Sequence, residues 1–142
     1  MIELEKIKPL IEKLAKKHRL SLVLLFGSRV SGKIHKHSDY DIAVLGDKPL
    51  DLMEEGKMVC DFFSIFQTQE VDLTDLKKAP PLLMKRIFDE NKILFCKNSE
   101  IYYKYQTYAL KRFIEARQLF EAGDDFFKFN INKFRQELKV LW

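Results

Sequence analysis

The sequence predicts an α+β (mixed α/β) domain, in which helices pack against a small mixed β-sheet and a pair of helices closes the C-terminal end. Two observations predict this class. Four short segments are typical of strands, at residues 20–26, 40–45, 70–73 and 92–96, and apolar residues recur at helical spacing between them. The chain has 142 residues, of which 46% are hydrophobic and twelve are Phe, so one domain with a sizeable core can form.

The first half of the chain alternates helix and strand around one loop. Residues 2–14 place Ile and Leu at helical spacing and predict an amphipathic helix that ends near Lys17. Residues 20–26 (LSLVLLF) are apolar throughout, which is typical of a central strand. Residues 40–45 form the second strand, and the Gly-Asp-Lys-Pro sequence at 46–49 ends it. The segment between the two strands is therefore predicted to be a loop.

The second half first continues this alternation. Residues 50–66 predict a helix because their apolar residues recur at helical spacing, and residues 70–73 (EVDL) form a short third strand. After a Pro-Pro pair, residues 82–89 are predicted to be helical, and residues 92–96 (KILFC) form the fourth strand. The predicted sheet thus has helices between most of its strands.

From Ser99 onward the chain is predicted to be entirely helical. Aromatic and Ala residues recur at helical spacing up to Gly123, which is expected to end one helix, and residues 126–142 form a last amphipathic helix. We therefore expect two units, a domain at residues 1–98 and a helical extension at residues 99–142. The aromatic side chains of the extension either complete the core of the domain or form a surface for a partner.

Composition excludes several classes of function. The net charge of +4 and the pI near 9.0 are mildly basic, and Lys and Arg are interleaved with Asp and Glu, so no direct DNA binding is expected. Cys60 and Cys96 are too few for a disulfide framework or a zinc site. No signal-peptide core and no apolar run long enough to span a membrane is present. We expect a soluble, cytoplasmic protein whose charge suits an anionic substrate.

The segment at residues 27–41, GSRVSGKIHKHSDYD, carries most of the functional information. Asp39 and Asp41 are spaced i, i+2, so a strand places both carboxylates on one face. Adjacent like charges repel, and such a pair is expected where a cation or a proton lies between them. Gly27 and Ser28 follow a strand directly and can offer backbone N–H groups and a hydroxyl to a phosphate. The segment therefore predicts Mg²⁺-dependent chemistry on a nucleotide.

Asp72 adds a third carboxylate on the next predicted strand. In the EVDL segment, the apolar side chains of Val71 and Leu73 face one side while Asp72 faces the other. Together with the first two carboxylates, Asp72 would complete an oxygen cage for two Mg²⁺ ions. Asp75 lies close by in sequence and competes for the same role.

Three other interpretations of the loop are weaker. Residues 27–33 fit the G-x-x-x-x-G-K pattern of a P-loop, but Ile34 stands where the Mg²⁺-binding Ser or Thr is needed. His35 and His37 could bind a metal, yet a His pair in a charged loop is more often a solvated surface feature. The aspartates could instead only cap turns, but that leaves the third carboxylate unexplained.

The motif also resembles that of a known family. Gly27-Ser28-Arg29-x-x-Gly32, five further residues and then Ser38-Asp39-x-Asp41 is similar to the signature of the DNA polymerase beta-type nucleotidyltransferase superfamily. The likeness covers roughly residues 20–75, and it implies the polymerase-beta-like nucleotidyltransferase fold for the domain at residues 1–98. The short chain, without a separate acceptor-binding domain, also resembles the minimal nucleotidyltransferases (MNT proteins) as far as Cys96. Many of these are antitoxins paired with HEPN-domain toxins.

The resemblance implies a role for each residue of the motif. Asp39 and Asp41 are expected to bind both Mg²⁺ ions, and Asp72 is expected to complete the shell of the catalytic ion and to accept the proton of the attacking hydroxyl. The nucleotide, ATP, is expected to contact the remaining motif residues Gly27, Ser28, Arg29 and Ser38. Arg29 either neutralises phosphate charge or is a solvated loop residue.

The acceptor implied by the resemblance is a partner protein. Transfer of AMP from ATP to a hydroxyl, expected to be that of a tyrosine, on a cognate HEPN toxin would make this chain an antitoxin and part of a hetero-oligomer. Two alternatives stay open. The chain could neutralise its toxin by binding alone, with a vestigial site, or it could modify a small molecule as antibiotic nucleotidyltransferases do.

Overall fold

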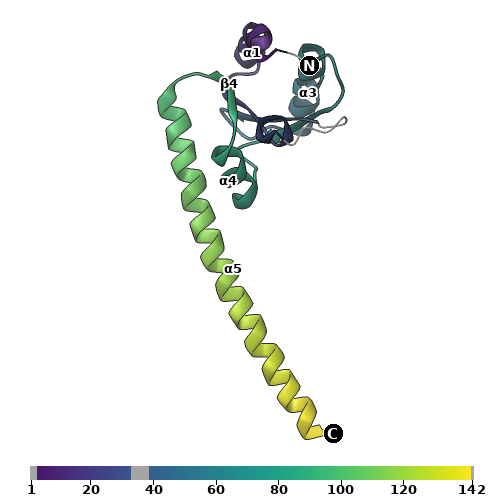
Figure 1. The fold of residues 1–142 in the computed structure, drawn as a ribbon, viewed down its shortest axis with the longest axis vertical. Coiled ribbons are helices and arrows are strands. Elements are labelled where there is room, and N and C mark those ends of the chain that lie inside the picture. The colour runs from purple at the N-terminus through teal and green to yellow at the C-terminus, as the bar shows by residue number, and fades with distance from the viewer. Residues whose placement is uncertain (1–2, 33–38, 142) are drawn as a thin grey trace.

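The computed structural model describes residues 3–32 and 39–141, and Figure 1 shows their arrangement. A compact mixed domain lies at the N-terminal end, and one long helix projects from it (Figure 1). In chain order the elements are α1 (Leu4–Lys17), β1 (Leu20–Phe26), α2 (Ser28–Ser31), β2 (Tyr40–Gly46), α3 (Leu52–Phe66), β3 (Val71–Asp75), α4 (Pro81–Asp89), β4 (Lys92–Cys96) and α5 (Ser99–Leu141).

The described strands form one mixed sheet with the order β3-β2-β1-β4. β1 runs antiparallel to both β2 and β4, while β2 and β3 are parallel. The β1–β2 register places Phe26 opposite Asp41, so the end of β1 meets the start of β2. The fold class predicted from the sequence is thereby confirmed.

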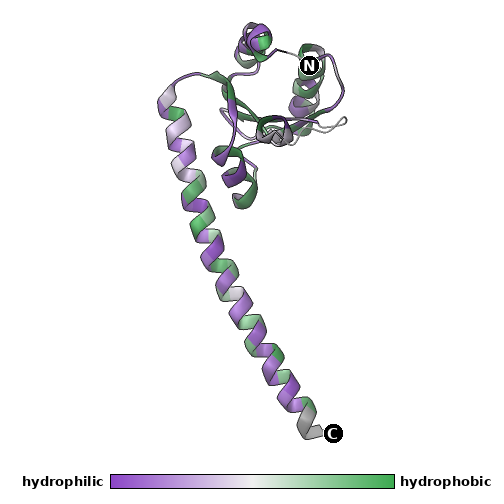
Figure 2. Cartoon of the chain, in the orientation of Figure 1, coloured by the Kyte–Doolittle hydropathy of each residue, from purple (hydrophilic) through white to green (hydrophobic). Residues whose placement is uncertain are grey.

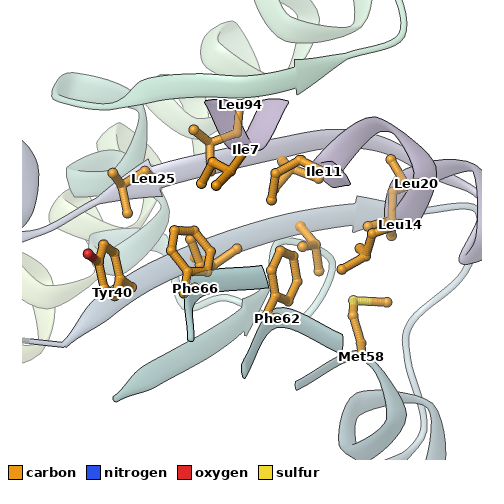
Figure 3. Close-up of a cluster of buried hydrophobic side chains, with 14 of the residues drawn as sticks. Ile7, Ile11, Leu14, Leu20, Leu25, Tyr40, Met58, Phe62, Phe66 and Leu94 are labelled. Carbon is orange, nitrogen blue, oxygen red and sulfur yellow. The ribbon is translucent and has the colours of Figure 1, made fainter. Parts of the chain in front are cut away.

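Helices cover both faces of the sheet, which explains why β1 and β2 carry apolar residues on both faces. Alternate residues of β1, such as Val23 and Leu25, belong to a buried cluster with α1 and α3. Their neighbours Leu22 and Leu24 belong to a second cluster with α4 and the start of α5. Figure 3 shows the first cluster, in which Phe62 of α3 points toward the sheet. We call the two sides the α1/α3 face and the α4 face.

Local signals set the ends of the helices that hold these faces. Asp51 caps α3 with a capping box, because its Oδ1 accepts a hydrogen bond from the Glu54 N–H at 2.8 Å and the Glu54 carboxylate accepts one from the Asp51 N–H at 3.3 Å. Pro81 occupies the first turn of α4, where its missing N–H costs nothing. These signals place the helix starts within two residues of the sequence prediction.

The predicted break at Gly123 is wrong, because α5 is one continuous helix from Ser99 to Leu141. A glycine in a helix interior costs only about 1 kcal/mol relative to alanine, and it ends a helix only when it adopts a left-handed cap. Here the apolar spacing continues on both sides of Gly123, as the alternating colours along α5 in Figure 2 show. The expected pair of C-terminal helices is therefore a single long helix.

The structure adds one element and adjusts others. The predicted loop contains the single-turn helix α2, and the third strand runs from Val71 to Asp75 rather than over residues 70–73. Within the part of the chain that the structure describes, no helix is long and apolar enough to cross a membrane.

Candidate functional site

β2 and β3 bring two of the predicted carboxylates side by side. Asp41 of β2 is the register partner of Asp72 of β3, and neighbouring strands lie about 4.8 Å apart. Asp41 and Ala43 are two residues apart on β2 and therefore point to the same face of the sheet. Ala43 belongs to the buried cluster on the α4 face. Asp41 and its register partner Asp72 therefore both lie on the α4 face. Asp39, the third predicted carboxylate, lies directly before β2 and is exposed. The structure thus brings the three predicted acids to one corner of the sheet.

The electrostatics of Asp41 reflect this grouping. Burial of its half-buried carboxyl raises its pKa above the ordinary value of 3.8, and the negative charges of Asp72 and Asp39 raise it further. Arg86 of α4 acts in the opposite direction and lowers the pKa of Asp41. Folding brings the carboxylates of Asp39, Asp41 and Asp72 together, and their negative charges repel one another. A cation bound among them would relieve this repulsion.

Gly27 leaves the space that the Asp41 side chain occupies. Its φ is +79° and its ψ is −154°, a backbone region that is essentially restricted to glycine. A Cβ added to Gly27 would lie 2.1 Å from Oδ2 of Asp41, far closer than real Cβ contacts allow. Gly27, which the sequence analysis expects to contact a phosphate, therefore also leaves room for the Asp41 carboxylate.

A cavity of about 470 Å³ opens beside Gly27. Ser28 and Ser31 of α2 line one side of it, and Arg86 and Glu90 at the end of α4 line the other. The backbone N–H of Ser31 is engaged within the turn, where it donates to the Gly27 carbonyl at 3.1 Å. The cavity thus combines two hydroxyls and the Arg86 guanidinium, which can bind phosphate, with the acidic side chains of Asp89 and Glu90. The Asp89 carboxylate is paired with Lys85.

The sequence analysis did not identify Arg86. A lone Arg in the last turn of a predicted helix carries no signal, and only the packing of α4 against the sheet brings it to the site. Met84 and Ile87 are fully buried on that face, which fixes the rotation of α4 and leaves Arg86 at the rim of the cavity. The described residues include no ion-pair partner within 4 Å of Arg86.

Arg29 lies elsewhere. Its guanidinium stacks over the ring of Tyr40, 4.1 Å from the ring centroid. Tyr40 belongs to the α1/α3 face, where Figure 3 shows it next to Phe66. Arg29 lines a separate cavity of about 900 Å³ between α1 and β4, which is larger than the one beside Asp41 but is lined by Leu25 and Tyr40 rather than by the carboxylate group. Its predicted contact with phosphate stays a prediction.

The remaining candidates separate clearly. Asp75 is buried, and its two oxygens accept backbone hydrogen bonds from Leu50 at 2.8 Å and from Lys77 at 2.9 Å, so it fixes a turn. Asp72 has no such duty among the described hydrogen bonds and is exposed next to Asp41. The predicted nucleotide contact Ser38 lies outside the described residues, as do the alternatives built on Ile34 and on the His pair at 35 and 37.

The raised pKa of Asp41 leads to a stability prediction. The folded chain holds the Asp41 proton to a higher pH than the unfolded chain, so this carboxyl contributes most to stability at low pH and opposes folding once it ionises above its raised pKa. Asp41→Asn cannot ionise, so we expect it to raise Tm at neutral pH without divalent cations. The difference should shrink as the pH is lowered toward 3.8. Thermal denaturation of both proteins across this range measures it.

The matched control for this prediction is Asp47→Asn. Asp47 lies on an exposed turn, and the hydrogen bond that it accepts from Lys77 uses its backbone carbonyl, which the substitution keeps. Its Tm should follow the wild type at every pH. A Tm for Asp41→Asn equal to or below that of the wild type at neutral pH would contradict the interpretation of the site as a group of repelling carboxylates.

Comparison with known proteins agrees with this geometry. The family model described as "Polymerase beta, Nucleotidyltransferase" matches residues 5–100. A protein adenylyltransferase MntA from Shewanella oneidensis is 35% identical over 77 residues, which is 54% of this chain and 55% of that enzyme. The alignment therefore spans little more than half the length of that relative.

Two solved structures share the fold over most of both chains. A crystal structure of a toxin–antitoxin with AMP-PNP is 26% identical, has a TM-score of 0.73, and aligns over 85% of this chain and 98% of its own. A complex of the tri-AMPylated Shewanella oneidensis HEPN toxin with an MNT antitoxin has a TM-score of 0.70 at 23% identity, over 89% of this chain and 99% of that one. The likeness of the second structure concerns the fold alone.

Proposed function

The chain belongs to the polymerase beta nucleotidyltransferase family, and we propose that it transfers AMP from ATP to a hydroxyl of a partner toxin and thereby acts as an antitoxin. One observation carries this proposal. Asp41 is held against Gly27, beside Asp72 and Asp39, at the edge of a cavity that also contains Ser28 and Arg86. The names of the similar proteins support the choice of donor and acceptor, since they include a protein adenylyltransferase and a toxin–antitoxin with AMP-PNP.

The three carboxylates of Asp39, Asp41 and Asp72 are suitable ligands for Mg²⁺. Within residues 3–32 and 39–141 no three acidic, His or Cys side chains converge into a ready-made metal cage. Mg²⁺ rarely uses such cages and is usually held by one or two carboxylates together with substrate phosphates and water. Asp39 and Asp41 would hold the ions with help from Asp72, and their mutual repulsion is relieved on binding. Bound Mg²⁺ would supply charge neutralisation for the entering and leaving oxygens at phosphorus.

The residues of the chain position the reactants. The hydroxyl oxygen of the acceptor forms a bond to the α-phosphorus of ATP, the bond from that phosphorus to the β-bridging oxygen breaks, and pyrophosphate leaves. Asp72 is exposed beside Asp41 and would accept the hydroxyl proton. Ser28 and Arg86 would hold the phosphate chain in the cavity, and Gly27 would allow its close approach.

We propose that the two parts of the chain have different roles. Residues 1–98 carry the transfer chemistry, and residues 99–142 form the helical extension. The described part of residues 1–98 contains no separate lobe that would enclose a small acceptor, and Asp72 faces solvent at the sheet edge. An acceptor presented on the surface of another protein suits this arrangement, and the tyrosine hydroxyl of a HEPN toxin is the acceptor we expect.

The proposal is tested by label transfer. The purified chain, Mg²⁺ and lysate of the source organism are incubated with ATP labelled either at the α-phosphate or at the γ-phosphate. We expect one labelled protein band with α-label and none with γ-label, and we expect EDTA to abolish it. Labelling of a small molecule would favour the antibiotic-type activity, and a bound partner that is never labelled would favour neutralisation by binding alone.

Arg86 provides a sharper test of the cavity. We expect Arg86→Ala to lower the transfer rate by about 100-fold, as the loss of one preorganised charge-stabilising donor does in other enzymes. Arg86→Lys should retain part of the rate, because it keeps the charge but loses the planar fork. Both variants should raise KM for ATP if Arg86 contacts the phosphates. Steady-state rates at varied ATP measure these effects.

Lys57→Ala is the matched control for Arg86→Ala, since it removes an exposed cation from a helix, α3, on the other face of the sheet. Its rate should equal that of the wild type. If Arg86→Ala transfers AMP as fast as Lys57→Ala does, the cavity beside Gly27 is not the phosphate site.

A further inference from the structure

The second half of α5 leaves the domain and buries nothing. The start of α5 packs on α4 through residues such as Ala109, but all side chains of residues 117–138 are exposed. Among them, Phe120 is 74% exposed, and Phe127 and Phe134 are both 61% exposed. Figure 2 shows apolar residues recurring along the projecting helix. An isolated helix rarely persists in water without packing, and apolar surface of this extent marks an interface.

Four phenylalanines of α5 follow a seven-residue repeat, of which the first, Phe113, is half-buried with Lys85 of α4 over its ring and the other three are exposed. Phe113, Phe120, Phe127 and Phe134 are each seven residues apart, and the third residue after each of the first three is Ala116, Gly123 or Asn130. Large residues and smaller residues thus alternate at three- and four-residue steps, which is the spacing of a coiled-coil seam. We call these seven residues the α5 seam. The three smaller residues of the seam can each lie opposite one large side chain of a facing helix.

The charges beside the seam reverse halfway along it. Residues 118–125 carry only negative charges, and residues 126–136 carry only positive ones. The negative residues are Glu121, Asp124 and Asp125, and the positive ones are Lys128, Lys133 and Arg135. A parallel pair of these helices would align like charges, whereas an antiparallel pair aligns each acidic half with a basic half. Taken as whole segments, the charges on the two sides of Asp125 therefore favour the antiparallel orientation.

We propose that the α5 seam pairs antiparallel with the same seam of a second copy of this chain. A two-fold axis near Asp125 places Phe127 opposite Gly123 of the second copy and Phe134 opposite Ala116, so that these two rings face small residues. In the same register Phe120 lies opposite Asn130 and Phe113 lies opposite Glu137. This inference does not depend on the proposed nucleotidyl transfer.

A groove at the base of α5 is in the right place to receive the end of the second helix. The cavity has a volume of about 630 Å³ and lies between the start of α4 and α5, where Leu82, Ala116 and Phe120 line it. Leu82 is 62% exposed at its rim. Because Phe134 of the second copy lies opposite Ala116 in the antiparallel register, its ring would enter this groove and cover Leu82. The seam and the groove then form one continuous interface.

The oligomeric state of the full chain tests the proposal. By analytical ultracentrifugation we expect twice the chain mass of 16.9 kDa. Phe127→Ser should raise the dissociation constant by about 30-fold or more, as the loss of a central aromatic anchor does. Phe129→Ser is the matched control, because Phe129 is equally exposed at 66% but lies on the opposite side of the helix from the seam. It should dimerise as the wild type does.

Disulfide trapping tests the orientation. In a Cys60→Ser, Cys96→Ser background, a chain with Leu119→Cys is mixed with a chain with Lys133→Cys and oxidised. The antiparallel seam predicts a cross-link between the two different chains and little between two Leu119→Cys chains. A monomeric wild type, equal effects of Phe127→Ser and Phe129→Ser, or cross-linking of Leu119→Cys with itself would each overturn the proposal. Loss of toxin binding alone in Phe127→Ser, with a monomeric wild type, would assign the seam to the toxin instead.

Discussion

Asp41→Asn is expected to reduce AMP transfer to the partner by at least about 100-fold. Loss of a residue that merely supports a metal ligand typically costs 10- to 100-fold, so loss of a carboxylate that binds the ion directly should cost more. Asn has nearly the same shape and fits against Gly27, so the change is one of charge rather than packing. Transfer of α-phosphate label to the partner, under single-turnover conditions, measures it.

The same variant also distinguishes a catalytic antitoxin from a binding one. Because Asp41→Asn relieves repulsion among the carboxylates, its fold should be intact, and Asp47→Asn again serves as the control for the loss of one acidic charge. If catalysis silences the toxin, cells producing the toxin with Asp41→Asn should stop growing, whereas those with Asp47→Asn should grow. Full protection by an inactive Asp41→Asn protein would show that binding suffices.

Much of the fold could be predicted because β1 and β2 are apolar at most positions on both faces, apart from Ser21 and Asp41, which indicates that both faces of the sheet are covered. The proximity of Asp39 to Asp41 could be predicted from the two-residue period of a strand, although Asp39 itself lies just before β2. Asp72 could be predicted from the alternation of Val71, Asp72 and Leu73, although Asp75 lies near the same strand in sequence, and the register places Asp72 beside Asp41. The hydrogen bonds of Asp75 to Leu50 and Lys77 then account for its burial.

Features that depend on tertiary packing could not be predicted. Arg86 reaches the site only because α4 packs on one face of the sheet, and Arg29 turns toward the other face because the ring of Tyr40 lies there. The break expected at Gly123 failed for a different reason. Glycine lowers helix propensity by a small amount, and a continued apolar repeat outweighs it. Local signals therefore located the carboxylates proposed to be catalytic but not the cations around them.

Gly27→Ala is expected to disable the site while leaving most of the fold in place. The new Cβ would lie 2.1 Å from Oδ2 of Asp41, so the carboxylate must move by about 1 Å to reach even the closest contacts that real Cβ atoms make. A displacement of about 1 Å in a catalytic group can cost about 100-fold in rate. The backbone strain at this φ should also lower the free energy of unfolding by about 1–3 kcal/mol. Label transfer and urea denaturation measure the two effects.

Gly32→Ala is the control that distinguishes backbone strain from the steric clash between the new Cβ at position 27 and the Asp41 carboxylate. Gly32 also has a positive φ, +82°, but among the described residues a Cβ there meets nothing within 4 Å, so this variant should lose some stability and keep Asp41 in place. A double-mutant cycle isolates the contact itself. In an Asp41→Ala background the obstacle is gone, so Gly27→Ala should destabilise the chain less than it does in the wild type. Equal destabilisation in both backgrounds would mean that Gly27 serves only the turn and that the position of Asp41 is set elsewhere.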